Sequence, residues 1–426
     1  MPGHKARGDF KSKFRDAVLD VTELSYSDNL HNPDGVIARA QKDIAEILGA
    51  EASYITTDGS TSGIYAMAYC ASKRGNKIIV FRNSHKSVWN ACKLFGLEPL
   101  IVQGAEREGI LQPPDGDIIE KLIANDVNIA GLLVTSPDYY GNFAPLARYR
   151  DIVKKYNRLL FVDGAHGAHL AFGDRKGYAG LSADMWVDGA HKTLATLTQG
   201  AIVNVNNTDL IPLAEEALNL FRTTSPSYPV MASVEYGVKC IANNTAALYR
   251  AKTAVEQFKN VEKDLTIYRS DDWTKLLIDF KPLGVSADIV ASKLEKKGIY
   301  PEFSDGRYIL FYLSPMTNAN DLAALKKRLT AILSNKRLKG TYKEKPSVPE
   351  GDRSYSFQYA LRKNSEWVEP DDAVGRMCAA NAGLAPPCIP VIVTGEMITL
   401  AAVKALTQAK HTFGMKDGKI CVVKKW

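Results

Sequence analysis

Two ionisable residues of this sequence stand just after short hydrophobic runs. Asp163 ends the run LLFVD, and Lys192 follows the run DMWVD by four residues. If both runs are strands of one parallel sheet, their carboxyl ends lie at the same edge and the two side chains can converge on one crevice. A lysine amine can form an imine with an aldehyde, and a carboxylate can pair with a ring nitrogen and keep it protonated. The pair therefore indicates covalent chemistry on an aldehyde ligand, although a lysine in such a turn is more often simply solvated.

A third stretch of sequence supplies groups that can hold a phosphate. In DGSTSGIYAM, Ser60, Thr61 and Ser62 fall at the predicted N-terminus of a helix. Hydroxyls and free backbone N–H groups at such a terminus attract anions, although a serine-rich helix cap explains this stretch equally well when it is taken alone. His85 follows a further predicted strand and offers a flat ring for stacking. A phosphate cradle, a flat ring, an acid and a lysine together indicate pyridoxal phosphate.

The runs that carry these residues belong to a regular alternation of predicted strands and helices. A helix is predicted over GVIARAQKDIAEILGA, with Gly49 as its stop. Apolar runs without polar alternation suit a parallel sheet that is covered on both faces. We therefore expect an α/β protein with a mostly parallel, doubly wound sheet and a site at the carboxyl ends of its strands. The predicted strands are KIIVF, PLIV, GLLVT, RLLFVD and DMWVD, and the helices between them are GIYAMAYCASK, SVWNACKLFG and LARYRDIVKKY.

Beyond this alternation the pattern changes. A long helix is predicted from about residue 225 to 259, broken near its start by Pro226 and Pro229. The segments WTKLLIDF, GRYILFYLS and IPVIV then alternate with helices such as NDLAALKKRLTAILSN, which predicts a smaller C-terminal α+β domain. The Pro- and Gly-rich segment 339–354 is expected to be an exposed loop. We divide the chain into an N-terminal arm (residues 1–35), a large cofactor-binding domain (36–260) and a C-terminal α+β domain (261–426).

The composition is that of an ordinary globular protein. The 426 residues are 46% hydrophobic and 24% charged, which suits one large domain and a smaller one. The net charge is +7, but the basic residues are scattered, so we expect no nucleic-acid surface. No apolar run has membrane-spanning length, and the N-terminus has no apolar signal core. The six cysteines have no metal-like spacing, which favours a reduced cytoplasmic protein with buried thiols and no metal site.

Several stretches of this sequence resemble, in order, the successive motifs of the ornithine/lysine/arginine decarboxylase family. The resemblance implies the aspartate-aminotransferase type of pyridoxal-phosphate fold (fold type I) and a short form of the family that lacks the N-terminal regulatory-type domain. The stretches are MPGHKARGDF, DVTELSYSDNLHNPDG, DGSTSGIYA, RNSHKSV, TSPDYYG, VDGAHGAHLAFG, ADMWVDGAHKTLATLTQGA, TTSPSYPVMAS and, after a gap, SEWVEPDDAVGRMCAANAGLAPPCIPVIVTGEMI.

The resemblance also implies roles for individual residues. Lys192 corresponds to the Schiff-base lysine, Asp163 to the partner of the pyridine nitrogen, and His191 to a neighbour of the reacting carbon. Glu396 corresponds to a C-terminal glutamate on the substrate side; if it does not bind the distal cation, Asp138 or Glu23 is the next candidate. The other cofactor-binding residues that the resemblance implies are Ser60, Thr61 and Ser62 for the phosphate, His85 and Ala165 for the ring faces, His166 for the ring hydroxyl, and Thr223 and Thr224 as a segment lent by a partner subunit.

The activity that the resemblance implies is decarboxylation of arginine, lysine or ornithine, which yields carbon dioxide and a polyamine-type amine. It implies a homodimer or a higher homo-oligomer. Two alternatives stay open: another pyridoxal-phosphate reaction on the same fold, such as transamination or side-chain cleavage, and a catalytically silent regulatory homologue. Retention of both Lys192 and Asp163 argues against the silent homologue.

Some residues depart from the family pattern or have a purely structural explanation. Gly164 stands where many relatives have an acid. Gly189 and Ala190 stand where many have hydroxyls, so we expect them to leave room for the cofactor, with more of the phosphate binding on the serine-rich stretch. The residues with a structural explanation are His169, which could satisfy backbone groups in a turn; His31 and Asn32, which could form a turn; Tyr139 and Tyr140, which could be core aromatics; and Cys388, which could be a buried thiol.

Overall fold

The computed structural model describes residues 2–261, 264–343, 355–385, 388–409 and 411–424. Its central element is a seven-stranded sheet in the order β1-β9-β8-β7-β6-β2-β3. The neighbours from β8 to β3 pair in parallel, whereas β9 runs antiparallel to β1 and β8. The mostly parallel sheet is therefore confirmed. Its strands are β1 (Ala52–Thr56), β2 (Lys77–Phe81), β3 (Glu98–Val102), β6 (Ile129–Thr135), β7 (Leu159–Gly164), β8 (Met185–Asp188) and β9 (Ala201–Val205).

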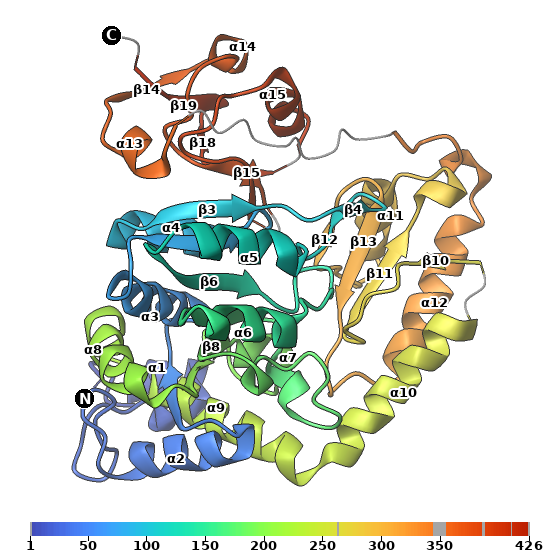
Figure 1. Ribbon diagram of the computed structural model, residues 1–426. Coiled ribbons are helices and arrows are strands. Elements are labelled where there is room, and N and C mark those ends of the chain that lie inside the picture. The colour runs from blue at the N-terminus through green and yellow to red at the C-terminus, as the bar shows by residue number, and fades with distance from the viewer. Residues whose placement is uncertain (1, 262–263, 344–354, 386–387, 410, 425–426) are drawn as a thin grey trace.

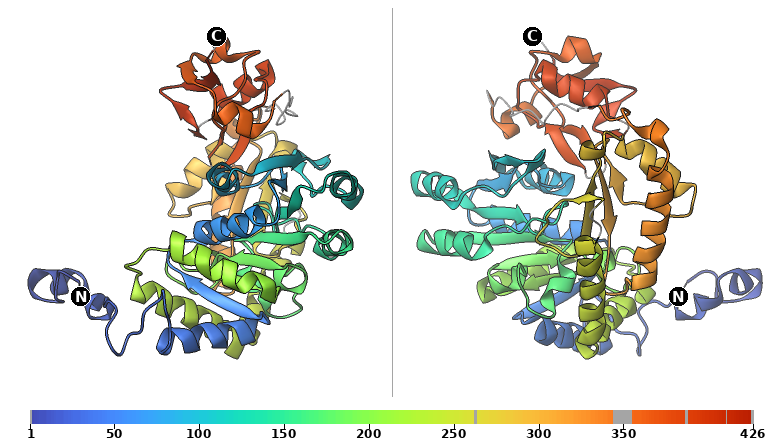
Figure 2. Two further views of the ribbon diagram at one scale, coloured as in Figure 1. Left: turned by 60° about the vertical axis from the view of Figure 1, so that its left-hand side comes forward. Right: turned by 90° about the vertical axis from the view of Figure 1, so that its right-hand side faces the viewer.

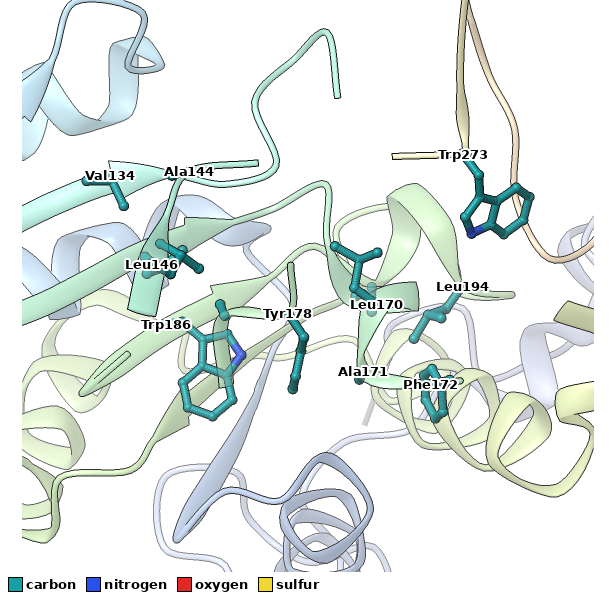
Figure 3. Packing of buried hydrophobic residues seen from close by; sticks show 14 of the residues in the cluster. Val134, Ala144, Leu146, Leu170, Ala171, Phe172, Tyr178, Trp186, Leu194 and Trp273 are labelled. Atoms are coloured by element: carbon teal, nitrogen blue, oxygen red, sulfur yellow. The ribbon is translucent and has the colours of Figure 1, made fainter. Parts of the chain in front are cut away.

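Helices cover both faces of this sheet, because alternate residues of each strand point to opposite sides. In β2, Ile78 and Val80 pack with α3, α4 and α8, whereas Ile79 and Phe81 pack with α2, α5, α6 and α9. Figure 3 shows part of the cluster that contains Ile79 and Phe81. Trp186 of β8 belongs to the same cluster and is fully buried. The helices are α2 (Val36–Leu48), α3 (Ser60–Ser72), α4 (Lys86–Phe95), α5 (Gly116–Asn125), α6 (Leu146–Lys155), α8 (Ile211–Phe221) and α9 (Tyr228–Asn243).

The long helix predicted from about residue 225 to 259 is instead two helices, α9 and α10 (Thr245–Val261). They meet at Asn244, which has φ −138° and ψ 55° and so ends the helical geometry. Pro226 precedes α9, and Pro229 lies in its first turn, where a missing backbone N–H removes no helical hydrogen bond. The prolines therefore mark the start of a helix and do not break one.

A second sheet lies next to the carboxyl ends of the parallel strands. It has four antiparallel strands in the order β10-β11-β13-β12. The arrows of β3 and β6 point toward it in Figure 1. We call this sheet and the helices on it the small domain; it places side chains opposite the ends of β6, β7 and β8. Its elements are β10 (Thr266–Ile267), β11 (Lys275–Asp279), β12 (Phe303–Ser304), β13 (Tyr308–Tyr312), α11 (Ala287–Glu295) and α12 (Ala319–Leu333).

The last part of the chain forms a further unit, which lies above β3 and α4 in Figure 1. It contains two three-stranded sheets, β14-β19-β18 and β16-β15-β17, around a core of their own. Most of the loop predicted over residues 339–354 lies outside the described residues. The elements of this unit are α13 (Phe357–Leu361), β14 (Ser365–Val368), α14 (Pro370–Ala373), β15 (Ala382–Leu384), β16 (Ile389–Ile392), α15 (Leu400–Thr407), β17 (Thr412–Phe413), β18 (Met415–Lys416) and β19 (Lys419–Val423).

The N-terminal segment packs less closely on the large domain than the rest of the chain does. Figure 2 shows that α1 (Gly8–Lys13) stands away from the large domain. Apolar side chains are exposed on and after it, among them Phe14 at 58%, Val18 at 64% and Leu19 at 60%. Within the described ranges, no helix is both long and apolar enough to cross a bilayer.

Candidate active site

A cavity of about 390 Å³ lies at the carboxyl ends of the parallel strands. Turns that follow β1, β2, β6, β7 and β8 contribute to its wall, as does the segment before β12. A larger hollow of about 710 Å³, with Arg158 and Asp184 in its wall, lies at the opposite ends of the strands and contains no residue predicted for the site. The predicted residues that line the first cavity are Ser60, Thr61, His85, Asp163, Ala165, His166, His191 and Lys192.

Lys192 and Asp163 reach this cavity from neighbouring strands, as their positions after β8 and β7 predict. The turn after β8 forms the short helix α7 (Ala190–Thr193), and the Lys192 backbone N–H donates to the Gly189 carbonyl at 3.0 Å. Burial lowers the pKa of Lys192 below its ordinary value, and the Asp163 charge partly offsets this effect. Burial raises the pKa of Asp163, and the Lys192 charge opposes the rise. A buried lysine with a lowered pKa presents more of the neutral, nucleophilic amine.

Two neutral histidine rings line the same cavity. His166 Nε2 lies 3.1 Å from Lys192 Nζ. Burial, followed by the charge of Lys192, holds the pKa of His166 well below its usual range. His85 caps α4, with Nδ1 2.8 Å from Ser87 Oγ, and burial lowers its pKa to about 4. Both rings are therefore uncharged at neutral pH. Nδ1 of His166 is buried and has no hydrogen-bond partner within the described part of the chain.

The start of α3 has the features of an anion cradle. Gly59 takes φ 69° just before the helix, a conformation that glycine adopts without strain. Ser60 Oγ is buried and has no partner among the described residues. Ser62, in contrast, does not line the cavity: its hydroxyl lies 2.7 Å from Thr56 Oγ1 and donates to the Gly59 carbonyl. Its predicted contact with phosphate is therefore not seen, because the side chain turns toward β1.

The small residues before Lys192 have a packing reason in addition to the space for the cofactor that we expected. A Cβ atom on Gly189 would collide with the Ala165 carbonyl oxygen and approach Ser60 Oγ at 3.1 Å. The glycine is therefore required by the close approach of two backbone turns as well as by space at the cradle. Ala190 is fully buried in the core. The His191 ring is held by the Gly200 carbonyl, 2.9 Å from Nδ1.

Three further predicted residues lie away from the cavity. Thr223 and Thr224 do not line it; Thr224 is exposed, and the Thr223 carbonyl lies 2.9 Å from His31 Nε2. His31 thus links the N-terminal arm to this segment. His169 does not satisfy the turn as expected, because its Nε2 lies 2.9 Å from Asp272 Oδ1 of the small-domain segment.

Glu396 is the largest difference between expectation and structure. It is 2% exposed, pairs with Arg82 after β2, and accepts a 2.8 Å hydrogen bond from the Val393 N–H on its other oxygen. Arg82 also donates to the Val391 carbonyl at 2.6 Å. Both carboxylate oxygens are thus used inside the chain and away from the cavity, so the expected contact with substrate is not met here. The alternative acid Asp138 is also buried and accepts three 2.9 Å hydrogen bonds.

Sequence reasoning did not single out Glu302, which lines the cavity. The Tyr139 hydroxyl donates to Glu302 Oε1 at 2.7 Å. Tyr139 lines the cavity as well and is therefore more than a core aromatic, whereas Tyr140 packs beneath it with Phe303. Cys388 is another wall residue and is only half-buried, so the expectation of a buried thiol is wrong there. Glu302 stands in an irregular segment before a two-residue strand, where no hydrophobic run marks it.

The sequence and the fold of this chain are similar to those of known proteins. A sequence model of the family described as "Orn/Lys/Arg decarboxylase, major domain" matches residues 2–276. The chain is 30% identical over 444 residues to "Uncharacterized protein YaaO" of Bacillus subtilis (strain 168), a match that covers 96% of this chain and 90% of that protein. It is 29% identical over 430 residues to "Arginine decarboxylase" of Bacillus anthracis, a match that covers 94% of this chain and 87% of that protein. The solved structure of the constitutive lysine decarboxylase of Escherichia coli superimposes with a TM-score of 0.81 at 18% identity, covering all of this chain and 79% of the other.

Proposed function

Because the chain belongs to the ornithine/lysine/arginine decarboxylase family, whose members are pyridoxal-phosphate-dependent lyases, we propose that it decarboxylates arginine, lysine or ornithine. The observation that carries this proposal is the convergence of Lys192 and Asp163 on one cavity beside the start of α3. Relatives named arginine decarboxylase and lysine decarboxylase support the basic substrate class.

The residues at the cavity fit pyridoxal phosphate. Ser60 Oγ and His166 Nδ1 are buried polar atoms without partners among the described residues, and such atoms are rare unless a ligand or water satisfies them. We assign the phosphate to Ser60, Thr61 and the first N–H groups of α3. Lys192 is the residue that we assign to react with the aldehyde of pyridoxal phosphate. The remaining assignments are Asp163 for the ring nitrogen, His85 and Ala165 for the two ring faces, and His166 for the ring hydroxyl.

The proposed reaction breaks the bond between Cα and the carboxylate of the amino acid. Carbon dioxide leaves without the electron pair of that bond, and Cα then gains one proton. An amino acid and one proton thus give carbon dioxide and a primary amine. Bound pyridoxal phosphate supplies the electron sink that this cleavage needs.

The chain's own residues prepare and complete this step. Asp163 is 2% exposed, and its carboxylate would raise the pKa of a ring nitrogen bound beside it. Asp163, Ala165 and His166 form a buried part of the cavity wall, and a substrate carboxylate held against it would be less hydrated, which favours loss of an uncharged product. Lys192 and His191 are the wall residues that we assign to deliver a proton to Cα.

A panel of amino acids with labelled carboxyl groups tests this function. We expect the purified holoenzyme to release carbon dioxide and a primary amine in equal amounts from arginine, lysine or ornithine, with one proton consumed per turnover. The Lys192→Ala variant serves as the matched blank. Transfer of the amino group to a keto acid without release of carbon dioxide would establish the aminotransferase alternative, and cleavage of the side chain without release of carbon dioxide would establish the lyase alternative. No reaction with any amino acid would favour a silent homologue.

We also propose that the enzyme is at least a homodimer. The arm that carries exposed Phe14, Val18 and Leu19 stands away from its own domain (Figure 2), and the exposed Thr224 segment lies outside the cavity of its own chain. An apolar surface of this kind is typical of a protein–protein interface. A second copy of the chain could cover the arm and receive this segment.

Light scattering should therefore give a mass of at least twice that of one chain at working concentrations. Phe14→Glu should weaken this association, because it places a charge on the apolar arm. Val127→Glu is the control, since Val127 is 78% exposed, follows the C-cap of α5 and lies outside the arm. A fully active monomer across the concentration range would refute the assembly.

A further inference from the structure

A substrate with a long cationic tail needs a negative group within the cavity that holds Lys192. Among the described residues, the wall of that cavity contains two acids, Asp163 and Glu302. Asp163 is buried beside Lys192 and is assigned to the cofactor, so it is not available for the tail. We propose that Glu302, held by Tyr139, binds the distal cation of the substrate, an inference that rests on the proposed function.

The carboxylate of Glu302 is fixed on one side and open on the other. Its Oε1 accepts the 2.7 Å hydrogen bond from Tyr139, while its Oε2 accepts none from any described residue. One oxygen is thus oriented by the protein, and the second is left for an ammonium or guanidinium donor. A charged acceptor of this kind forms stronger hydrogen bonds than a neutral one.

Tyr139 is itself held rigidly, so that it can orient Glu302. Its ring centroid lies 5.5 Å from those of His166, Phe303 and Tyr312. Burial and then the Glu302 charge raise the pKa of Tyr139 far above its ordinary value. The hydroxyl therefore stays protonated and remains a donor. The same aromatic rings can face a cationic tail favourably.

Glu302 and Lys192 line the same cavity and are close enough for the charge of one to affect the other. The Glu302 carboxylate is one of the groups that act to raise the pKa of Lys192, against the larger effect of burial. Lys192 is half-buried, whereas Glu302 is exposed. A substrate whose amino end reacts at Lys192 would therefore extend its tail outward to Glu302. Of the three acids named in the sequence analysis, Glu396 and Asp138 have their oxygens occupied elsewhere, and Glu23 is exposed and does not line the cavity.

The test compares a cationic substrate with its uncharged counterpart. The pairs are arginine with citrulline, lysine with norleucine and ornithine with norvaline, and the pair is chosen by the substrate that the wild type decarboxylates. We expect Glu302→Gln to lower the kcat/KM ratio of cationic over uncharged substrate by roughly 10- to 100-fold, mainly through KM of the cationic one. Tyr139→Phe should give a smaller loss of the same kind, and Glu302→Asp should retain part of the preference.

A second measurement does not depend on turnover. Titration of each holoenzyme with the product amine, followed by the visible absorbance of the cofactor, should show weaker binding in Glu302→Gln at unchanged cofactor content. Glu295→Gln is the matched control, because Glu295 is an exposed glutamate of the same small domain outside the cavity.

The outcomes separate this inference from the proposed function. Suppose that the wild type decarboxylates a basic amino acid, and that Glu302→Gln has the same preference for the cationic substrate and the same affinity for the product amine as the control Glu295→Gln. The role of Glu302 is then refuted, and the proposed function stands. If the wild type decarboxylates no basic amino acid, the function fails and this inference fails with it.

Discussion

Lys192→Ala is expected to lower decarboxylation by at least roughly 1,000-fold, because it removes the nucleophilic amine on which the other groups depend. Borohydride should fix pyridoxal phosphate to the wild type but not to the variant, and the visible absorbance of the covalently held cofactor should disappear. Cofactor fixation is measured by mass spectrometry of the reduced protein. The fold should survive, since Lys192 lies in a turn and its Nζ contacts only His166 among the hydrogen bonds of the described chain.

Lys259 provides a demanding control for this result. Burial lowers its pKa to about 8, so a larger fraction of its amine is neutral near physiological pH than for an ordinary lysine. Its Nζ, however, donates to the carbonyls of Trp273 and Lys275 and does not line the cavity. Lys259→Arg keeps a donor there and should leave fixation intact. Cofactor that is still fixed in Lys192→Ala, or lost in a folded Lys259→Arg, would show that the assignment of Lys192 is wrong.

Asp163→Asn should keep the cofactor but lose most turnover. A carboxylate beside a ring nitrogen raises the pKa of that nitrogen, and a neutral amide cannot. The loss of this effect could raise the barrier by several kcal/mol, with each ~1.4 kcal/mol lowering the rate about tenfold. We therefore expect kcat to fall by roughly 100-fold or more with little change in KM.

The substitution is conservative enough for this test to be interpretable. An asparagine side-chain oxygen can still accept the 3.2 Å hydrogen bond that the Ala165 N–H donates to Asp163. Asp184→Asn is the control: Asp184 is a half-buried carboxylate at the opposite end of the sheet that accepts a 2.8 Å hydrogen bond from the Leu160 N–H. Near wild-type kcat in a folded Asp163→Asn would exclude the proposed pairing with the ring nitrogen.

The sequence was sufficient to predict which strand ends meet. Buried parallel strands appear as uninterrupted apolar runs, and their carboxyl ends share one edge, so Asp163, His85 and Lys192 could be brought together without coordinates. The family resemblance added His166 and Ala165, and the structure places both on the same cavity. These residues are positioned by backbone elements, which local pattern specifies well.

Side-chain direction after an irregular turn was not predictable in the same way. Glu396 follows a strand as Asp163 does, but Arg82, which is distant in sequence, draws it away from the cavity. Ser62 turns toward Thr56 for a similar reason. Glu302 was missed because it lies in a segment with no regular pattern, and only tertiary packing against Tyr139 gives it a place.

The contact between His169 and Asp272 has a consequence for which substitutions this protein can tolerate. Asp272 is fully buried and pairs with His169 of the large domain on one oxygen and with Lys275 on the other. Replacing Asp272 leaves Lys275 buried without its carboxylate partner, and replacing Lys275 removes the cation that compensates Asp272. Breaking a buried pair in this way costs about 3–5 kcal/mol, a large share of a typical folding free energy. A single substitution at Asp272 or Lys275 is therefore opposed unless the partner changes with it. The joint between the two domains therefore limits substitution through folding stability, whereas the cavity wall, which contains Lys192 and Asp163, limits it through the reaction.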